Sequence, residues 1–387
     1  MQHFGYLSRA DTMTLFERPP EPFGPESTTE ALSIALGATL YIPANRPSLP
    51  QDITKQSLAG ATAAVLCLED AVPDDIVPWA ESNLVGALQQ LHASRGDRLP
   101  LLFVRVRDTG QIPRLVRELG PAVAILAGFV LPKFTADTGP AYLDALDEAD
   151  ERSGRELLVM PVLESGVILH AETRVAELTR LRALLIRHRR RVLAVRIGAT
   201  DLCALYGLRR SPELSVYDVK VIADLIADVI NMLGRTDGTG FTLAGPVWEY
   251  FAGPGRLFKP QLRRSPFDEQ DRAELRGALV TRSMDGLIRE VQMDKANGLI
   301  GKTTIHPSHV PVVNALHVVS LEEYRDARDV LEADQMGGVR PSAHGNKMNE
   351  IGPHTAWARA TMLRSGVYGV AADGVSYVDL LAASLSR

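Results

Sequence analysis

Residues 157–164 read LLVMPVLE and residues 192–198 read VLAVRIG, and these two stretches decide the fold. Each is a nearly continuous apolar run with a carboxylate at its end, Glu164 in the first and Asp201 just beyond the second. Runs of this kind are typical of strands that are buried on both faces of a parallel sheet. Six more such runs predict strands at residues 39–44, 63–69, 101–106, 128–133, 241–247 and 301–306.

Amphipathic stretches separate the predicted strands. The clearest is Val216–Leu233, with apolar residues at helical spacing and Ser215 before it as a candidate N-cap. Alternating strands and helices predict parallel pairing with right-handed crossovers. Eight strands between residues 38 and 315 indicate an α/β protein, a TIM-type (β/α)8 barrel. A doubly wound sheet is the competing fold, but residues 41–47 read YIPANRP where its first turn needs GxGxxG.

The chain ends flank this predicted barrel, which spans residues 38–315. Residues 1–37 read as an N-terminal extension, because four prolines between residues 18 and 27 interrupt regular structure. We expect either an arm that follows the surface or a disordered tail. Residues 316–387 have helical patterns but no barrel strand, which predicts a C-terminal helical segment that acts as a lid or an oligomer contact.

Composition excludes several classes of protein. The 387 residues include 42 Lys and Arg against 47 Asp and Glu, a formal charge of −5, and 45% are hydrophobic. This balance is typical of globular proteins, and the slight acidity disfavours nucleic-acid binding. The apolar runs are short of the ~20 residues that span a bilayer, and no secretory signal is visible. Two cysteines cannot form a disulfide framework or a four-thiolate zinc site. We therefore expect a cytoplasmic protein that acts on small molecules and binds neither membrane nor nucleic acid.

Polar residues gather at the carboxyl ends of the predicted strands, where TIM barrels carry their chemistry. Any one of them could be a solvated loop charge, but the opposite strand ends lack such a set. In strand order they are Asn45 and Arg46, Glu69 and Asp70, Arg105 and Arg107, Lys133, Glu164, Asp201, Trp248 and Glu249, and His306.

Glu164 and Asp201 follow neighbouring strands and can therefore point into one cavity. A carboxylate pair with open positions suits Mg²⁺, which keeps water and takes further oxygens from a substrate. Arg46 and Arg105 could bind a carboxylate or phosphate through two hydrogen bonds each. A divalent ion and guanidinium groups together would stabilise the negative oxygen of an enolate. The structural alternative for the two carboxylates is a buried ion pair with Arg or Lys.

Seven motifs resemble, in order, the HpcH/HpaI aldolase and citrate lyase beta-subunit family, which includes malyl-CoA lyases. They occur in the family's order over about residues 38–315, and seven in order are far more specific than any one of them. The motifs are Tyr41-Ile-Pro-Ala-Asn-Arg-Pro47, Leu68-Glu-Asp-Ala-Val72, Val104-Arg-Val106, Leu131-Pro-Lys133, Pro161-Val-Leu-Glu-Ser-Gly166, Gly198-Ala-Thr-Asp-Leu202 and Gly301-Lys-Thr-Thr-Ile-His-Pro307.

The resemblance implies a barrel of the phosphoenolpyruvate/pyruvate kind that makes or breaks a C–C bond through a metal-stabilised enolate. It implies Mg²⁺, with Mn²⁺ as an alternative, a carboxylate-bearing substrate that is an acyl-CoA thioester or a 2-oxo acid, and a homo-oligomer, either trimer or hexamer. The residues it implies are Glu164 and Asp201 as metal ligands, Arg105, Glu69 and Asp70 as catalytic groups, and Arg46, Arg105, Lys133, Gly198 and Ala199 as substrate contacts.

The C-terminal segment also has a counterpart in the family. Members close the site with a Lys-Met-x-Asp-like motif, commonly from a neighbouring subunit, and residues 347–350 read KMNE here. Glu350 replaces the usual Asp. It is either a catalytic acid/base group or an ordinary surface glutamate, and in the second case a metal-bound water would move the proton. The basic run at 187–191, the segment 244–251 and the loop 258–267 depart from the standard chain. They resemble a divergent subgroup associated with tellurium-resistance and stress gene clusters.

Three other patterns were weighed. Residues 296–303 nearly match the phosphate-binding loop GxxxxGKT, but the lysine precedes a strand instead of a helix. His306 and His309 form an HxxH pair without further clustered zinc ligands. The run 187–191 fits either the charged end of a helix or a site for a phosphate, such as that of coenzyme A. Two other functions stay open, a non-catalytic barrel subunit of a multi-enzyme system and an enzyme for a phosphorylated or nucleotide-like metabolite.

Overall fold

The computed structural model describes residues 1–94, 99–251, 284–333 and 337–385. Its centre is a parallel sheet in the order β8-β7-β6-β5-β4-β3-β2-β9. A parallel bridge between Gly245 and Lys302 joins the two outer strands, so the sheet closes into a barrel. The predicted (β/α)8 barrel is confirmed. Its strands are β2 (Ala38–Pro43), β3 (Ala63–Cys67), β4 (Leu101–Arg105), β5 (Leu126–Leu131), β6 (Leu158–Leu163), β7 (Val195–Ile197), β8 (Leu243–Ala244) and β9 (Lys302–Thr304).

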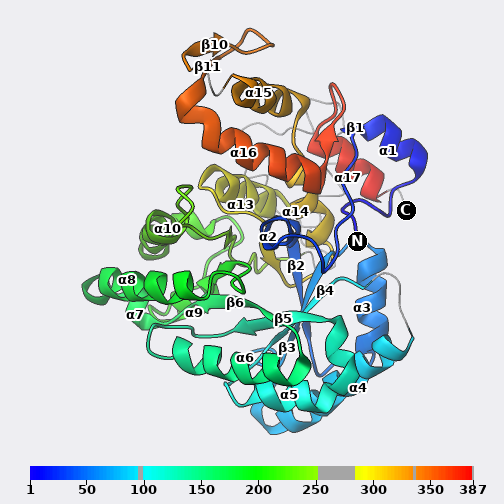
Figure 1. Cartoon of the computed structure of the whole chain (residues 1–387), viewed down its shortest axis with the longest axis vertical. Helices are drawn as coiled ribbons and strands as arrows, with labels where there is room; N and C mark the ends of the chain where they lie inside the picture. The colour runs from blue at the N-terminus through cyan, green and yellow to red at the C-terminus, as the bar shows by residue number, and fades with distance from the viewer. Residues whose placement is uncertain (95–98, 252–283, 334–336, 386–387) are drawn as a thin grey trace.

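Helices cover the outside of the barrel (Figure 1). Two short helices, α7 (Gly166–Leu169) and α9 (Ala199–Ala204), begin at the carboxyl ends of β6 and β7, where they help to shape the strand-end face. The longer helices around the barrel are α3 (Leu49–Leu58), α4 (Val77–Ala93), α5 (Gln111–Leu119), α6 (Gly139–Ser153), α8 (Ala171–Arg187), α10 (Lys220–Leu233), α13 (Met284–Ala296) and α14 (His309–His317).

The helix predicted over Val216–Leu233 is wrong at its first turn. Residues 216–218 form a separate 3₁₀ turn, and Val219 is extended with φ −87° and ψ 95°. Ser215 caps this turn through a capping box, in which the Asp218 carboxylate accepts from the backbone N–H of Ser215 at 2.8 Å. Because Asp218 closes the turn on itself, the α-helix begins only at Lys220.

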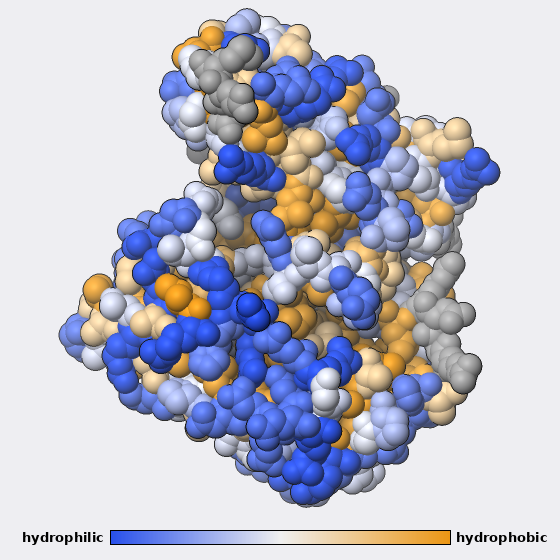
Figure 2. All heavy atoms as spheres, viewed as in Figure 1, coloured by the Kyte–Doolittle hydropathy of each residue, from blue (hydrophilic) through white to orange (hydrophobic). Residues whose placement is uncertain are grey.

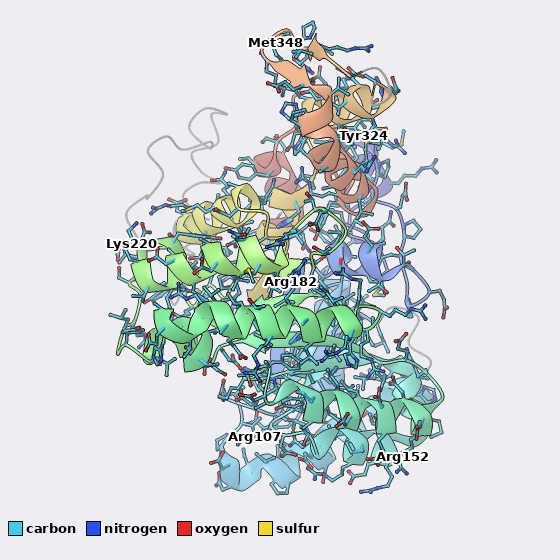
Figure 3. The ribbon with its side chains drawn as sticks, turned by 60° about the vertical axis from the view of Figure 1, so that its left-hand side comes forward. Arg107, Arg152, Arg182, Lys220, Tyr324 and Met348 are labelled. Carbon is cyan, nitrogen blue, oxygen red and sulfur yellow. The ribbon has the colours of Figure 1, made fainter. Side chains whose placement is uncertain are left out.

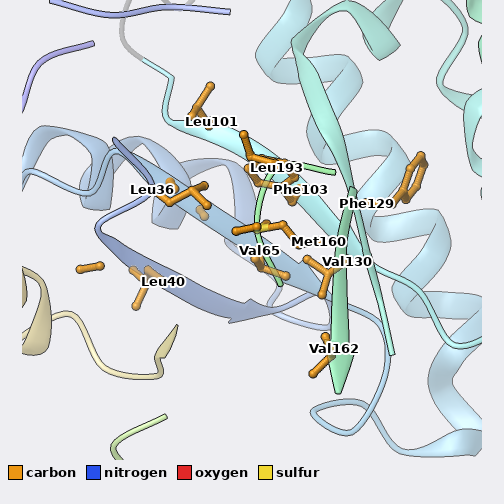
Figure 4. Packing of buried hydrophobic residues seen from close by; sticks show 14 of the residues in the cluster. Leu36, Leu40, Val65, Leu101, Phe103, Phe129, Val130, Met160, Val162 and Leu193 are labelled. Carbon is orange, nitrogen blue, oxygen red and sulfur yellow. The ribbon is translucent and has the colours of Figure 1, made fainter. Parts of the chain in front are cut away.

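Apolar side chains make up much of the barrel interior. Val65, Phe103 and Met160 are fully buried and turn toward the middle of the barrel, whereas Phe129 points outward to the helices (Figure 4). These buried side chains leave the chemistry to the strand ends, where barrels of this kind carry it.

Residues 1–37 form a packed arm. Helix α1 (Arg9–Leu15), strand β1 (Phe16–Arg18) and helix α2 (Thr29–Ala35) follow one another, and Phe4, Phe16 and Phe23 are buried. Strand β1 pairs antiparallel with β12 (Val370–Ala371), and the two chain ends lie close together (Figure 1). The arm therefore ties the C-terminal segment to the barrel.

The C-terminal segment projects from the barrel (Figure 1). Its helices α15 (Leu321–Glu332) and α16 (Ile351–Tyr368) pack on each other and carry a hairpin of β10 (Val339–Pro341) and β11 (Met348–Glu350), while α17 (Tyr377–Leu385) returns to α14. Figure 2 shows an indentation between this projection and the barrel, with hydrophobic residues at its inner end. Among the described helices, none is long and apolar enough to cross a membrane.

Candidate active site

Arg105, the last residue of β4, is the centre of the site. It is 9% exposed, and its Nη2 lies 2.8 Å from Glu69 Oε2, 3.3 Å from Asp70 Oδ2 and 3.0 Å from Glu164 Oε1. Burial tends to lower the pKa of Arg105, but Glu164 and the other surrounding acids raise it overall. Within the described residues, Nη1 donates no hydrogen bond, and Nε is buried without a partner. The guanidinium therefore keeps N–H groups available for a further acceptor.

Glu164 directly follows β6 and is 4% exposed. Its Oε1 accepts from Arg105 Nη2 and, at 2.8 Å, from the backbone N–H of Lys133. Lys133 reaches this geometry with a positive φ of 47°, a strained conformation for a residue other than glycine. Burial and the charge of Asp201 raise the pKa of Glu164 to about 7, against the opposing effect of Arg105. The carboxylate is therefore held in place at an electrostatic cost.

The adjacent acids Glu69 and Asp70 have opposite properties. Burial raises the pKa of Glu69, but hydrogen bonds from Asp70 and Lys133 and the charge of Arg105 lower it overall to about 2. Burial and hydrogen bonding to Glu69 raise the pKa of Asp70 to about 6. Asp70 is about half exposed, with 51% of its side chain accessible, and can exchange a proton with solvent or a ligand near neutral pH.

Asp201 enters the site from the first turn of α9, next to β7. Gly198 and the buried Ala199 connect the strand to this helix. A Cβ on Gly198 would lie 2.3 Å from Glu164 Oε2, so only glycine leaves room for that carboxylate. Asp201 adds repulsion to both Glu164 and Asp70, which places the three negative charges within electrostatic reach of one another.

These side chains form what we call the strand-end cluster. It has four acids and two cations, so its formal charge is 2 − 4 = −2. Among the described residues, no group of three or more His, Cys, Asp or Glu side chains is arranged to hold a metal ion. A divalent ion here would use Glu164 and Asp201 and complete its shell with water and substrate oxygens. The members are Glu69, Asp70, Arg105, Lys133, Glu164 and Asp201.

Two predicted site residues lie apart from this cluster. Arg46 follows β2, and its Nε pairs with Asp52 Oδ2 at 2.5 Å while 53% of its side chain is exposed. Glu350 is exposed at the end of β11. Figure 3 shows Met348, two residues away, at the tip of the projection, far from Arg107 beside the strand-end cluster. One chain therefore does not bring its own Glu350 to its own cluster.

The competing patterns have structural explanations. In the basic run 187–191, Arg189 donates to the carbonyls of Thr239 and Gly240, and Arg191 pairs with Asp150 at 2.9 Å. This run lies before β7, at the opposite end from the strand-end cluster. Residues 296–303 run from helix to strand, the reverse of a phosphate-binding loop. The loop 258–267 lies outside the described residues.

Two polar residues inside the barrel, the buried Arg196 and the partly exposed Tyr41, were not predicted as site residues. Arg196 is the one charged residue within the apolar run 192–198. Tyr41 is two residues from Thr39 on β2, so its side chain lies on the same, inward face of that strand as Thr39, which bonds to Arg196. A charged residue inside an otherwise apolar strand is the signal that could have identified Arg196.

Comparison with known proteins gives the class. A model of C–C bond lyases of the TIM-barrel fold matches residues 30–370, so the chain belongs to this C–C bond lyase family. None of the curated protein sequences compared with the chain matches it.

Solved structures agree with the fold. CitE from Mycobacterium tuberculosis, in complex with magnesium, acetoacetate and coenzyme A, is 21% identical with a TM-score of 0.50 over 86% of this chain and 99% of that one. Haloferax volcanii malate synthase, as a magnesium/glyoxylate complex, is 14% identical with a TM-score of 0.51 over 72% and 74% of the two chains. The predicted family resemblance is confirmed, and the tellurium-resistance subgroup stays a prediction.

Proposed function

We propose that the protein is a Mg²⁺-dependent C–C lyase or aldolase whose substrate carries a carboxylate, either an acyl-CoA thioester or a 2-oxo acid. The observation that carries this proposal is the charge of −2 in the strand-end cluster. Four ionised acids against two cations are unfavourable in a partly buried site unless a cation or protons join them, and the raised pKa values of Glu164 and Asp70 reflect this. The Mg²⁺ in the solved CitE and malate synthase complexes supports the same ion here, with Mn²⁺ as an alternative.

Each residue has a proposed task. Glu164 and Asp201 would hold the metal, whose chemistry is to stabilise negative charge on substrate oxygens. Arg105 binds the substrate carboxylate through Nη1, because its Nη2 is already held by acids. Lys133 and the backbone around Gly198 and Ala199 line the site as substrate contacts.

Proton transfer needs a group with a pKa near neutrality. Asp70 meets this condition, since its pKa is raised to about 6 and its side chain is about half exposed. Glu69 stays ionised, with its pKa lowered to about 2, and anchors Arg105 and Lys133. The proposal therefore assigns proton movement to Asp70 and orientation to Glu69.

The first experiment measures thermal stabilisation by Mg²⁺ across a panel of 2-oxo acids and acyl-CoA thioesters. A ligand that stabilises the wild type only with Mg²⁺, and fails to stabilise Asp201→Asn, supports the proposal and gives the substrate class. Asp228→Asn is the matched control, because it removes a carboxylate that pairs with Arg174 on the outer helices. Absence of any Mg²⁺ response in the wild type would contradict the metal site and favour a non-catalytic subunit.

We further propose that residues 316–387 act as a lid on a neighbouring subunit of a homo-oligomer, a trimer or hexamer. The contacts of the β10–β11 hairpin leave two of its side chains available to a neighbouring subunit. Lys347 and Asn349 bind the buried Asp326, at 2.7 and 3.1 Å, while Met348 and Glu350 stay exposed. Mixing inactive Asp201→Asn and Glu350→Gln chains tests this. We expect the mixture to recover activity. A lone 42.1 kDa monomer in sedimentation would exclude a lid supplied by a neighbouring subunit.

A further inference from the structure

A second guanidinium lies inside the barrel. Arg196 on β7 is 1% exposed, its Nη1 donates to Thr39 Oγ1 at 3.3 Å, and its Nη2 donates to Thr303 Oγ1 at 2.5 Å. Among the described residues, no carboxylate lies within ion-pair distance of it. A buried charge without a counter-ion is costly, so the barrel must gain something from its presence.

Tyr41 is the aromatic neighbour of this charge. The guanidinium carbon of Arg196 lies 5.7 Å from the centre of the Tyr41 ring. Burial lowers the pKa of Arg196, and the electrostatic interaction with Tyr41 opposes that lowering. Tyr41 is two residues beyond Thr39 on β2, nearer the carboxyl end, and its phenol also interacts electrostatically with Arg105 and Glu164. Tyr41 thus lies between Arg196 and the strand-end cluster.

The Tyr41 hydroxyl has no hydrogen-bond partner among the described residues. Arg196 lies against the Tyr41 ring and donates its own N–H groups to Thr39 and Thr303. The phenol O–H is therefore available to a ligand, because a phenol can donate as well as accept. Burial raises the pKa of the Tyr41 phenol, which keeps that hydrogen in place at neutral pH. Tyr41 is also partly exposed, so a molecule in the site can reach it.

We propose that Tyr41 donates a hydrogen bond to a carboxylate or enolate oxygen of the substrate anion, and that Arg196, which lies against the Tyr41 ring, is the residue that positions the phenol from below. This inference rests on the proposed function and names a further substrate contact in the same site. Arg196 also supplies a fixed positive charge under the anion, and the attraction between the two is stronger in the barrel than in water.

The test is a double-mutant cycle read by ligand affinity, with the Mg²⁺-dependent ligand found in the thermal panel. Tyr41→Phe should weaken binding about tenfold, as expected for a lost hydrogen bond to a charged group. Arg196→Gln should weaken binding of the wild type by a similar factor but change the affinity of Tyr41→Phe less than about twofold. Arg196→Lys keeps the charge and should restore part of the affinity. Tyr368→Phe is the control, because it removes a buried hydroxyl that bonds to Ile34 O far from the site.

The outcomes separate this inference from the proposed function. If wild type binds a ligand with Mg²⁺ and Tyr41→Phe binds it equally well, the inference is overturned and the proposed function stands. If no ligand binds the wild type, the proposed function fails, and ¹³C NMR of ζ-labelled tyrosine decides the Arg196–Tyr41 unit. A Tyr41 signal that moves in Arg196→Gln supports the unit, and an unchanged signal overturns it; Tyr41→Phe assigns the signal among the nine tyrosines.

Discussion

The molecule has two clusters of charged side chains, one partly exposed at the carboxyl ends of the strands and one buried outside the barrel. The strand-end cluster has an excess of two negative charges and partly exposed members, with Asp70 and Lys133 51% and 55% exposed. The second, which we call the wall cluster, lies between β9 and α13 and consists of Arg210, Glu290, Asp294 and Lys302. These four side chains are 0–2% exposed, with two cations against two acids, and the more exposed Glu249 lies 4.0 Å from Arg210 at the edge of the cluster.

The wall cluster satisfies its charges internally. Lys302 Nζ lies 2.9 Å from Glu290 Oε1 and 2.7 Å from Asp294 Oδ2, and Arg210 Nη1 lies 2.5 Å from Glu290 Oε2. Tyr217 adds a hydrogen bond to Asp294 at 2.8 Å. The difference teaches that burial of charge does not by itself mark a site. A site is marked instead by an excess of one charge, by access to solvent and by a strained neighbour such as Lys133.

The largest expected effect breaks the wall cluster. Lys302→Met leaves Glu290 and Asp294 buried without their shared cation, so we expect a loss of about 3–5 kcal/mol in the free energy of unfolding. Denaturant unfolding measures it. Arg152→Met, which removes an exposed pair with Glu148, is the control and should cost little. A loss below about 1 kcal/mol for Lys302→Met would show that the two clusters are not different in kind.

The strand-end cluster should respond in the opposite way. Glu164→Gln keeps an acceptor for Arg105 and for the Lys133 N–H and removes one excess charge. We expect the metal-free protein to change in stability by less than about 1 kcal/mol, while Mg²⁺-dependent ligand stabilisation disappears. Thermal unfolding with and without Mg²⁺ measures both. A severe loss of stability without metal would mean that Glu164 is mainly a structural ion-pair partner of Arg105.

Low pH should destabilise the fold through the buried His317. His317 Nε2 accepts from the Gly301 N–H at 2.9 Å and its Nδ1 donates to Val313 O at 2.8 Å, so the ring is neutral. Burial first, then the charge of Lys295, lowers its pKa from 6.5 to about 3. Below pH 6.5 the unfolded chain binds a proton at His317 and the folded chain does not, so the free energy of unfolding decreases as the pH is lowered.

The size of this effect can be checked directly. At pH 5 the lowered pKa of His317 corresponds to about 2 kcal/mol of lost stability relative to pH 8. His317→Gln can make both hydrogen bonds without titrating, so its stability should vary less between pH 8 and pH 5. An identical pH profile for the two proteins, measured by urea unfolding, would refute the assignment.

The smallest expected effect is at Arg46. Its side chain is 53% exposed and pairs with Asp52 outside the cluster, so Arg46→Gln should change stability by less than about 0.5 kcal/mol. Its effect on ligand affinity sharpens the comparison. A change below about twofold would restrict substrate binding to the strand-end cluster, whereas a large change would restore Arg46 as the substrate contact that the sequence predicts.

The sequence predicted the barrel well because a parallel strand buried on both faces leaves a continuous apolar run, and eight such runs occur here. It also predicted most of the strand-end cluster, since Glu69, Arg105, Lys133 and Glu164 directly end or follow their strands. Strand position alone was sufficient for these residues, because parallel strands place their carboxyl ends on one face.

The rest depends on contacts between distant segments. The break at Val219 follows from Asp218 folding back on Ser215, which helical periodicity does not reveal. The position of Arg46 follows from its pairing with Asp52. Tyr41 and Arg196 meet only when β2 and β7 close into one barrel, so no local pattern brings them together.

The most direct test of the strand-end cluster is Mn²⁺ binding followed by electron paramagnetic resonance, with Mg²⁺ as competitor. We predict one site per chain in the wild type, displaced by Mg²⁺ and lost in Glu164→Gln/Asp201→Asn, while Glu290→Gln, if folded, retains it. Equal Mn²⁺ binding by the wild type and the double variant, or none by the wild type, would contradict the account.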